Sequence, residues 1–134
     1  MKLLRYINQS KVVLDANVIL RYLLSDNEQL AENAATMIAS KKCSASLEVI
    51  AEVVFVLQSK RLYNIPRDEI ALGLTALTYE IQIKRKRVLR YALQAYCEKP
   101  KLDFIDCILY GYSRLGYTIF TFDKKLNRKI YDRS

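Results

Sequence analysis

The fold class is indicated by one stretch of the chain, KVVLDANVILRYLL at residues 11–24. Residues 11–14 are mostly apolar and β-branched, as in a short buried strand, and Asp15 follows them directly. Residues 17–24 then have the length and the apolar content of a helix. The stretch therefore predicts a strand that leads into a helix, with a carboxylate at the junction.

The same alternation continues along the rest of the chain. A short strand or a turn is expected at 43–46, and further strands are expected at 80–83 and at 117–122, the last of them buried. Helices are expected at 28–40, 46–60, 66–77, 86–98, 103–116 and 124–130. Strands that alternate with helices indicate an α/β fold with a mostly parallel central sheet flanked by helices. No linker or repeat divides the sequence, so residues 1–134 are expected to form a single domain.

Composition excludes several kinds of chemistry. The chain has no histidine, which removes histidine nucleophile pairs, histidine general bases and histidine-ligated zinc. Its three glycines cannot form a P-loop or a G-x-G-x-x-G turn. The three cysteines are widely spaced and are expected to be buried, reduced thiols. An enzyme with this composition must work mainly through carboxylates.

The net charge and the apolar runs suggest partners and location. A net charge of +8 favours a polyanionic partner, although it also serves solubility. The apolar runs are too short to cross a bilayer, and a charge follows Met1 at once. We therefore expect a cytoplasmic protein that does not associate with membranes.

Four acidic residues stand in apolar surroundings: Asp15, Glu52, Asp106 and Asp123. Carboxylates in such places are costly to desolvate, and a bound cation is a common compensation. Asp15 and Asp123 each follow an expected strand, which would bring both to the carboxyl edge of the sheet. Each residue also has a simpler interpretation. Glu52 would suit a solvated helix edge, and Asp103, three residues before Asp106, would suit a helix cap.

Four segments in order carry a resemblance to a known family. They are VLDANVILRYLL at 13–24, IAEVVFVL at 50–57, LDFIDCIL at 102–109 and FTFDKKL at 120–126. Together they resemble the four motifs of PIN-domain ribonucleases, specifically VapC-type toxins of bacterial and archaeal toxin–antitoxin pairs. The resemblance runs from about residue 11 to residue 130, and it implies a PIN-like domain. Cys107 departs from it, because the family commonly has a small residue such as alanine there.

The resemblance implies a metal site. Carried over by position, Asp15, Glu52, Asp106 and Asp123 match the family's catalytic, metal-binding acids, and Asp103 matches a further acidic position. Asn17 and Thr121 match polar positions that support the site. Glu48 lies one helical turn from Glu52 and competes with it, but the motif favours Glu52. Mg²⁺ or Mn²⁺ is the expected cofactor, since hard cations prefer carboxylate oxygens.

The implied activity is metal-dependent endoribonuclease cleavage that leaves 3′-hydroxyl and 5′-phosphate ends. The family also implies RNA as substrate, a cognate antitoxin of a type II pair, and a homodimer. Candidate RNA contacts are Lys84, Arg85, Lys86, Arg87, Lys124, Lys125 and Arg128. The alternative is a PIN-like module that binds RNA or protein without cutting it. Aspartyl phosphotransfer is less favoured, because Asp15-Ala16-Asn17 lacks the second aspartate of a D-x-D motif.

Overall fold

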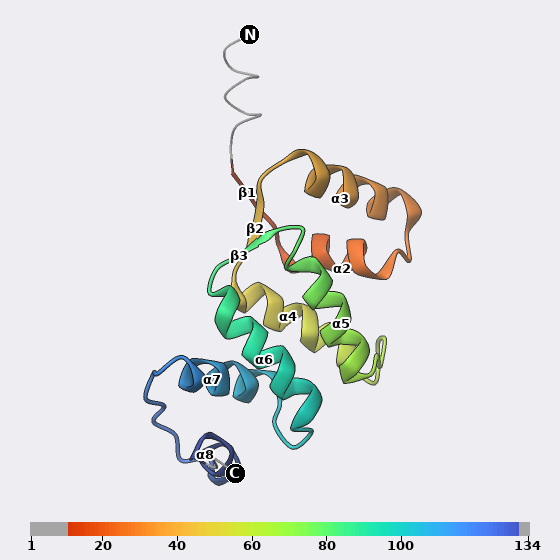
Figure 1. Ribbon diagram of the computed structural model, residues 1–134. Helices are drawn as coiled ribbons and strands as arrows, with labels where there is room; N and C mark the ends of the chain where they lie inside the picture. The colour runs from red at the N-terminus through yellow and green to blue at the C-terminus, as the bar shows by residue number, and fades with distance from the viewer. Residues whose placement is uncertain (1–10, 132–134) are drawn as a thin grey trace.

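The computed structural model describes residues 11–131, and Figure 1 shows how the elements are arranged. The strands are β1 (Val12–Val13), β2 (Cys43–Ala45) and β3 (Gln82–Ile83). The first helices are α2 (Ala16–Leu24), α3 (Glu28–Ser40), α4 (Leu47–Gln58) and α5 (Arg67–Leu77). The remaining helices are α6 (Lys86–Glu98), α7 (Phe104–Arg114) and α8 (Lys124–Tyr131).

The three strands form one parallel sheet in the order β1-β2-β3. Val12 lies opposite Cys43 in the first pairing, and Ser44 lies opposite Gln82 in the second. Because each crossover between parallel strands needs a long connection, the helices between the strands flank the sheet. The predicted α/β class, with a mostly parallel sheet flanked by helices, is confirmed.

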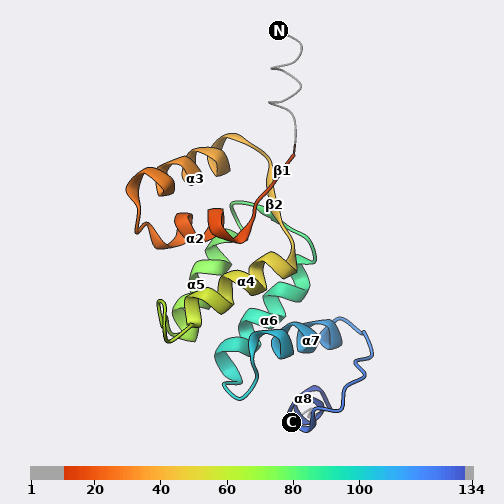
Figure 2. The same ribbon diagram turned by 180° about the vertical axis from the view of Figure 1, so that it is seen from behind.

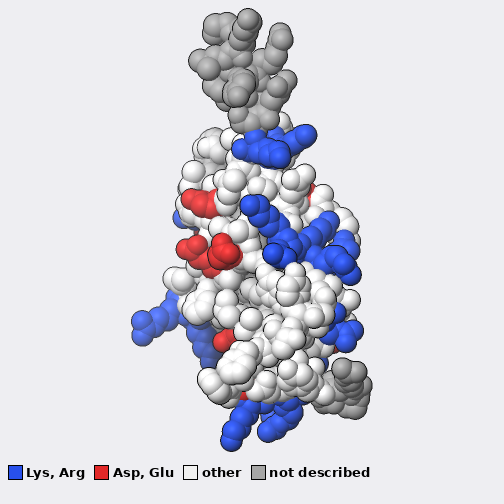
Figure 3. All heavy atoms as spheres, turned by 90° about the vertical axis from the view of Figure 1, so that its left-hand side faces the viewer, with Lys and Arg blue, Asp and Glu red and all other residues white. Residues whose placement is uncertain are grey.

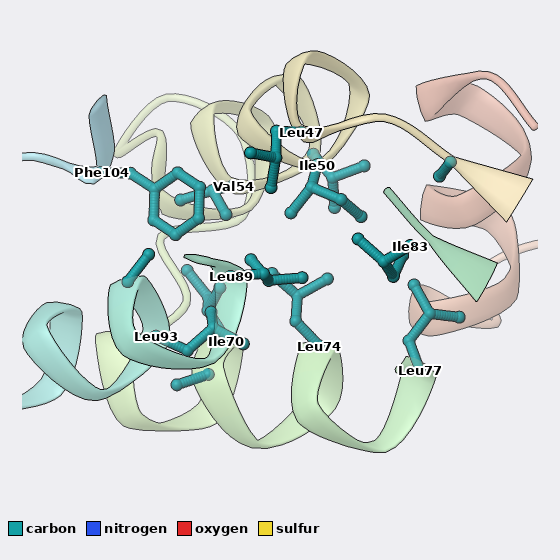
Figure 4. Packing of buried hydrophobic residues seen from close by; sticks show 14 of the residues in the cluster. Leu47, Ile50, Val54, Ile70, Leu74, Leu77, Ile83, Leu89, Leu93 and Phe104 are labelled. Carbon is teal, nitrogen blue, oxygen red and sulfur yellow. The ribbon is translucent and has the colours of Figure 1, made fainter. Parts of the chain in front are cut away.

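Helix α4 is central to the packing and contacts α2, α5 and α7. In both views it lies between the α2–α3 pair at one end of the molecule and α7–α8 at the other (Figures 1 and 2). Its residues Ile50, Val53 and Val54 are fully buried. Figure 4 shows Ile50 and Val54 facing the apolar side chains of α5 and α6, among them Leu74 and Leu89. This core fixes the helices that carry the acidic residues.

The last connection of the chain differs from the prediction, because 117–122 is not a strand. Phe120 is 85% exposed and Phe122 is 88% exposed, and their rings pack edge to face at a centroid distance of 5.3 Å. The segment runs from the end of α7, where Gly116 adopts a positive φ of 97°, to the start of α8. An alternating apolar run becomes a strand only if a neighbouring strand pairs with it, and among residues 11–131 none does.

Two further expectations about burial need correction. Val13 in β1 is 75% exposed, so this strand is covered on one side only, while Leu14 beyond it is buried. Cys43 and Cys107 are buried free thiols as predicted, but Cys97 is exposed near the end of α6. Within the described residues, no helix has the length and apolar content needed to cross a membrane.

Candidate functional site

Asp15 lies at the junction between β1 and α2. It is exposed, and its Oδ1 accepts a hydrogen bond from the Val18 N–H at 3.0 Å, which makes it the N-cap of α2. Its second oxygen, Oδ2, has no hydrogen-bond partner among the described residues. Asn17 is exposed in the first turn of the same helix. The strand and the cap together hold the Asp15 carboxylate at the carboxyl edge of the sheet.

Asp103 and Asp106 form a reciprocal cap at the start of α7. The Asp106 N–H donates to Asp103 Oδ1 at 2.8 Å, and the Asp103 N–H donates to Asp106 Oδ2 at 3.3 Å. The expected capping role of Asp103 is therefore present. The two carboxylates share one helix terminus, where the helix dipole favours negative charge.

Asp123 caps the start of α8. Its Oδ1 accepts hydrogen bonds from the backbone N–H groups of Lys125 at 2.8 Å and Leu126 at 3.1 Å. The Asp123 N–H in turn donates to the hydroxyl of Thr121 at 3.1 Å. Asp123 follows an exposed loop rather than the expected strand, so the sheet edge does not place it. Its orientation comes from the helix cap.

Glu52 lies on the exposed side of α4, and Glu48 lies exposed one turn before it. The spacing of four residues puts both side chains on one face of the helix, so the two carboxylates lie on the same side of α4. Helix α4 packs against α2, which Asp15 caps, and against α7, which Asp103 caps. Glu52 is thus carried by the helix that lies between the other acidic residues.

The electrostatics connect three of the carboxylates. Burial raises the pKa of Asp106 above its usual value, and the charge of Asp103 and then that of Asp123 add to the rise. Asp103 and Asp123 therefore lie near enough to oppose the ionisation of Asp106. Among residues 11–131, no three acidic or cysteine side chains converge closely enough to hold a metal ion.

The donor set nevertheless suits a hard divalent cation. Every candidate ligand is a carboxylate, and oxygen donors are what Mg²⁺ and Mn²⁺ prefer. Burial raises the pKa of Asp106 most, and the charges of Asp103 and Asp123 add to the rise; a bound cation would offset that negative charge. Asp15, Asp106 and Asp123 each retain one carboxylate oxygen without a hydrogen bond among the described residues. The residues present fit the metal in charge and chemistry.

The cysteines do not offer a rival centre. Burial raises the pKa of Cys107 to about 12, so its thiol stays protonated at neutral pH. The Cys107 side chain is fully buried in the hydrophobic core, which accommodates a side chain larger than that of alanine at this position. Desolvation also raises the pKa of Cys43 and of Cys97. None of the three has the electropositive setting of a reactive thiolate.

The candidate RNA contacts fall into two groups. Lys84 to Arg87 span the start of α6. Lys84 and Arg87 are exposed there, and the Arg85 guanidinium donates to the Tyr117 hydroxyl at 3.2 Å. Lys124, Lys125 and Arg128 are exposed on α8, directly after Asp123. Arg85 is also the N-cap of α6 with a left-handed backbone, φ 63°. Its charge is therefore partly used within the fold, and the Lys86 Nζ likewise lies over the ring of Tyr79.

Sequence analysis missed one basic feature. Lys84 and Lys86 line a cavity of about 730 Å³ together with Lys11, Lys41 and Lys42. The signal was present, because Lys11 and Lys42 each stand directly before a strand. In a parallel sheet such residues meet at the amino edge. About thirty residues separate Lys11 from Lys42 in the sequence, so only the pairing of β1 with β2 brings them together.

A second cavity lies beside Asp15. It has a volume of about 390 Å³, and its lining is largely apolar and comes from β1, α2 and α3. Val13, Leu30 and Met37 line it and are exposed. Asp15 and Asn17 are among its polar lining residues. An apolar hollow therefore adjoins the first of the candidate carboxylates.

Comparison with known proteins identifies the family. The model of the PIN domain matches residues 12–130. PIN domains are generally nuclease modules, and they usually use divalent metals. Neither the search of curated proteins nor that of solved structures gave a match. Because the matched range covers nearly the whole chain, the chain belongs to the PIN domain family.

Proposed function

We propose that this chain is a metal-dependent endoribonuclease that hydrolyses RNA phosphodiesters. Asp15, Glu52, Asp106 and Asp123 would hold one or two Mg²⁺ or Mn²⁺ ions, with Asp103 beside them. The observation that carries the proposal is the coupled carboxylate group at the starts of α7 and α8. There, burial and the charges of Asp103 and Asp123 raise the pKa of Asp106.

The chain's own residues bind and orient in this mechanism. When bound, the metal lowers the pKa of a water molecule and stabilises charge on the phosphate. Asp15, Asp106 and Asp123 are each fixed by a helix cap, which limits the rotation of the carboxylate and leaves one oxygen without a hydrogen bond from residues 11–131. Thr121 holds the backbone of Asp123 in place. Such prior positioning is the main contribution of a protein to phosphoryl transfer.

The basic residues would guide RNA to these carboxylates. Lys84 follows β3, and its N–H donates to the Ala45 carbonyl at the end of β2. It thus lies at the same edge of the sheet as Asp15, two strand spacings or about 10 Å away across the sheet. Lys124 and Lys125 follow Asp123 directly, which places positive charge beside the other end of the acidic group.

The same proposal extends to biological role. The resemblance to VapC-type toxins supports a cytoplasmic toxin of a type II pair, with a cognate antitoxin that covers the acidic residues. A homodimer is proposed through the apolar hollow lined by Val13, Leu30 and Met37. Exposed apolar surface of this kind is suited to burial against a partner chain.

A second candidate is a PIN module that binds RNA without cleaving it. It is favoured by one observation: among the described residues, no three acidic side chains converge on a point that could hold a metal. In this case Asp15, Asp103 and Asp123 would serve as helix caps only.

Matched substitutions separate the two candidates. Glu52→Gln should abolish Mn²⁺- or Mg²⁺-dependent RNA cleavage, whereas Glu48→Gln, one turn away on the same exposed face, should retain it. If only Glu48→Gln lost activity, Glu48 rather than Glu52 would be the residue that holds the metal. Activity that survives Glu52→Gln, Asp15→Asn and Asp106→Asn would refute the metal-dependent mechanism.

A further inference from the structure

We propose that the lysine-lined cavity beside β3 binds the phosphate backbone of single-stranded RNA, as a substrate contact separate from the acidic residues. We call it the lysine groove. Its lysines are Lys11, Lys41, Lys42, Lys84 and Lys86. The inference rests on the proposed function, because it names the path by which the substrate reaches the site.

Charge is the first argument for the lysine groove. Among the described residues that line it, five are lysines and Glu80 is the only acidic one. The Glu80 carboxylate accepts a hydrogen bond from the Tyr22 hydroxyl, so it is held by another part of the chain. Lys11, Lys42 and Lys84 are exposed. A concave surface with this excess of positive charge attracts a polyanion, and lysine binds phosphate as a compact point charge.

The shape and position of the groove are the second argument. Lys11 and Lys42 stand before β1 and β2, whereas Lys84 follows β3, so the groove reaches from the amino edge of the sheet to its carboxyl edge. The carboxyl edge is where Asp15 lies. In the upper part of Figure 3, Lys and Arg side chains gather mainly toward one side of the face and Asp and Glu toward the other. A backbone bound in the groove would therefore lead toward the acidic residues.

The exposed ring of Tyr79 indicates that the bound RNA is single-stranded. Its side chain is 74% exposed at the groove, and the Lys86 Nζ lies 5.3 Å from its ring centroid. An exposed ring beside lysines offers a stacking surface for an unpaired base while the lysines hold phosphates. Bases inside a duplex are already stacked and would not reach the ring. The groove thus combines the two kinds of contact that single-strand binding uses.

The test measures RNA binding without relying on cleavage. Fluorescence anisotropy of a labelled single-stranded RNA is followed as salt is raised, in the full chain carrying Asp15→Asn and without added metal. Replacing Lys11, Lys42 and Lys84 by alanine should lower the slope of log affinity against log salt by about 2, since each phosphate contact contributes about 0.7. Tyr79→Ala should weaken binding by about tenfold with an unchanged slope.

The matched control removes three charges elsewhere. Lys60, Arg61 and Lys101 are exposed and lie outside the groove, and their alanine variant should keep the slope of the parent. Equal slopes for the groove and control variants would overturn the proposal. So would a groove variant that loses binding to poly-glutamate but not to RNA, which would indicate an acidic protein partner. A wild-type chain that binds RNA through the lysine groove but cuts no RNA would support the proposal for the groove and refute the proposed nuclease activity.

Discussion

Asp103 and Asp106 each donate their backbone N–H to the other's carboxylate, at 3.3 Å and 2.8 Å. This exchange closes the first turn of α7 and keeps two negative charges on one helix terminus. Asp106 is the less exposed of the two, and it carries the raised pKa. The relationship therefore links a structural cap to the electrostatics of the proposed metal site.

The first prediction concerns the pKa of Asp106. Asp103→Asn keeps a side-chain oxygen for the cap but removes a charge, so the pKa of Asp106 should fall toward its usual value. Asp123→Asn should lower it by less, because its charge contributes less to the rise. Carboxyl NMR titration of the metal-free protein measures both.

The raised pKa of Asp106 also predicts how the stability of the fold depends on pH. An acid whose pKa is raised by folding favours the folded state at low pH, and this contribution is lost as the pH rises through the folded pKa. A pKa of Asp106 that is unchanged in both variants would show that the three carboxylates are not coupled.

The second prediction separates the two roles of Asp15. Asp15→Ala removes the cap of α2 and should lower the free energy of unfolding by about 1 kcal/mol. Asp15→Asn keeps a capping oxygen and should change it by only a few tenths of a kcal/mol. Both should lose RNA cleavage. Urea denaturation and a cleavage assay on the same preparations check this, and full activity in Asp15→Asn would limit Asp15 to capping.

The third prediction uses two helical glycines with different surroundings. A Cβ at Gly111 in α7 would lie 2.6 Å from the Val88 carbonyl oxygen of α6, so Gly111→Ala should destabilise the protein by about 1–3 kcal/mol. A Cβ at Gly73 in α5 would meet nothing closer than Leu23 at 4.0 Å. Gly73→Ala should therefore stabilise by about 0.5–1 kcal/mol. Thermal melting of both variants should show opposite shifts.

The fourth prediction concerns the segment before Asp123. Since Phe120 and Phe122 are exposed, replacing either by serine should change the free energy of unfolding by no more than about 0.5 kcal/mol. Phe104→Ala, at a buried position, should cost about 3–5 kcal/mol. A loss of several kcal/mol at Phe120 would mean that the segment packs as a buried strand.

Local signals in the sequence predicted most of the elements. Helix 86–98 was predicted with its observed bounds because its apolar residues recur at helical spacing, and Asp103 is a helix cap as expected. The prediction of a strand at 117–122 is wrong, for a reason that is not local. Its apolar alternation is local, whereas a strand requires pairing with another segment, which local sequence does not specify.

The candidate site could be predicted only in part. Sequence pattern singled out the acidic residues, but the capping roles of Asp15 and Asp123 depend on the geometry of each helix start. The lysine groove required the parallel register that brings Lys11 and Lys42 to one edge of the sheet.

The central claim is most directly tested by cleavage of a single-stranded RNA as Mg²⁺ or Mn²⁺ is titrated into the metal-free protein. The wild-type chain should cut only with metal, and Asp106→Asn, at the carboxylate whose pKa is raised by burial and by the charges of Asp103 and Asp123, should reduce the rate by about 100-fold or more. The products should carry 3′-hydroxyl and 5′-phosphate ends. Cleavage that persists in excess chelator, or an Asp106→Asn variant as active as the wild type, would contradict the account.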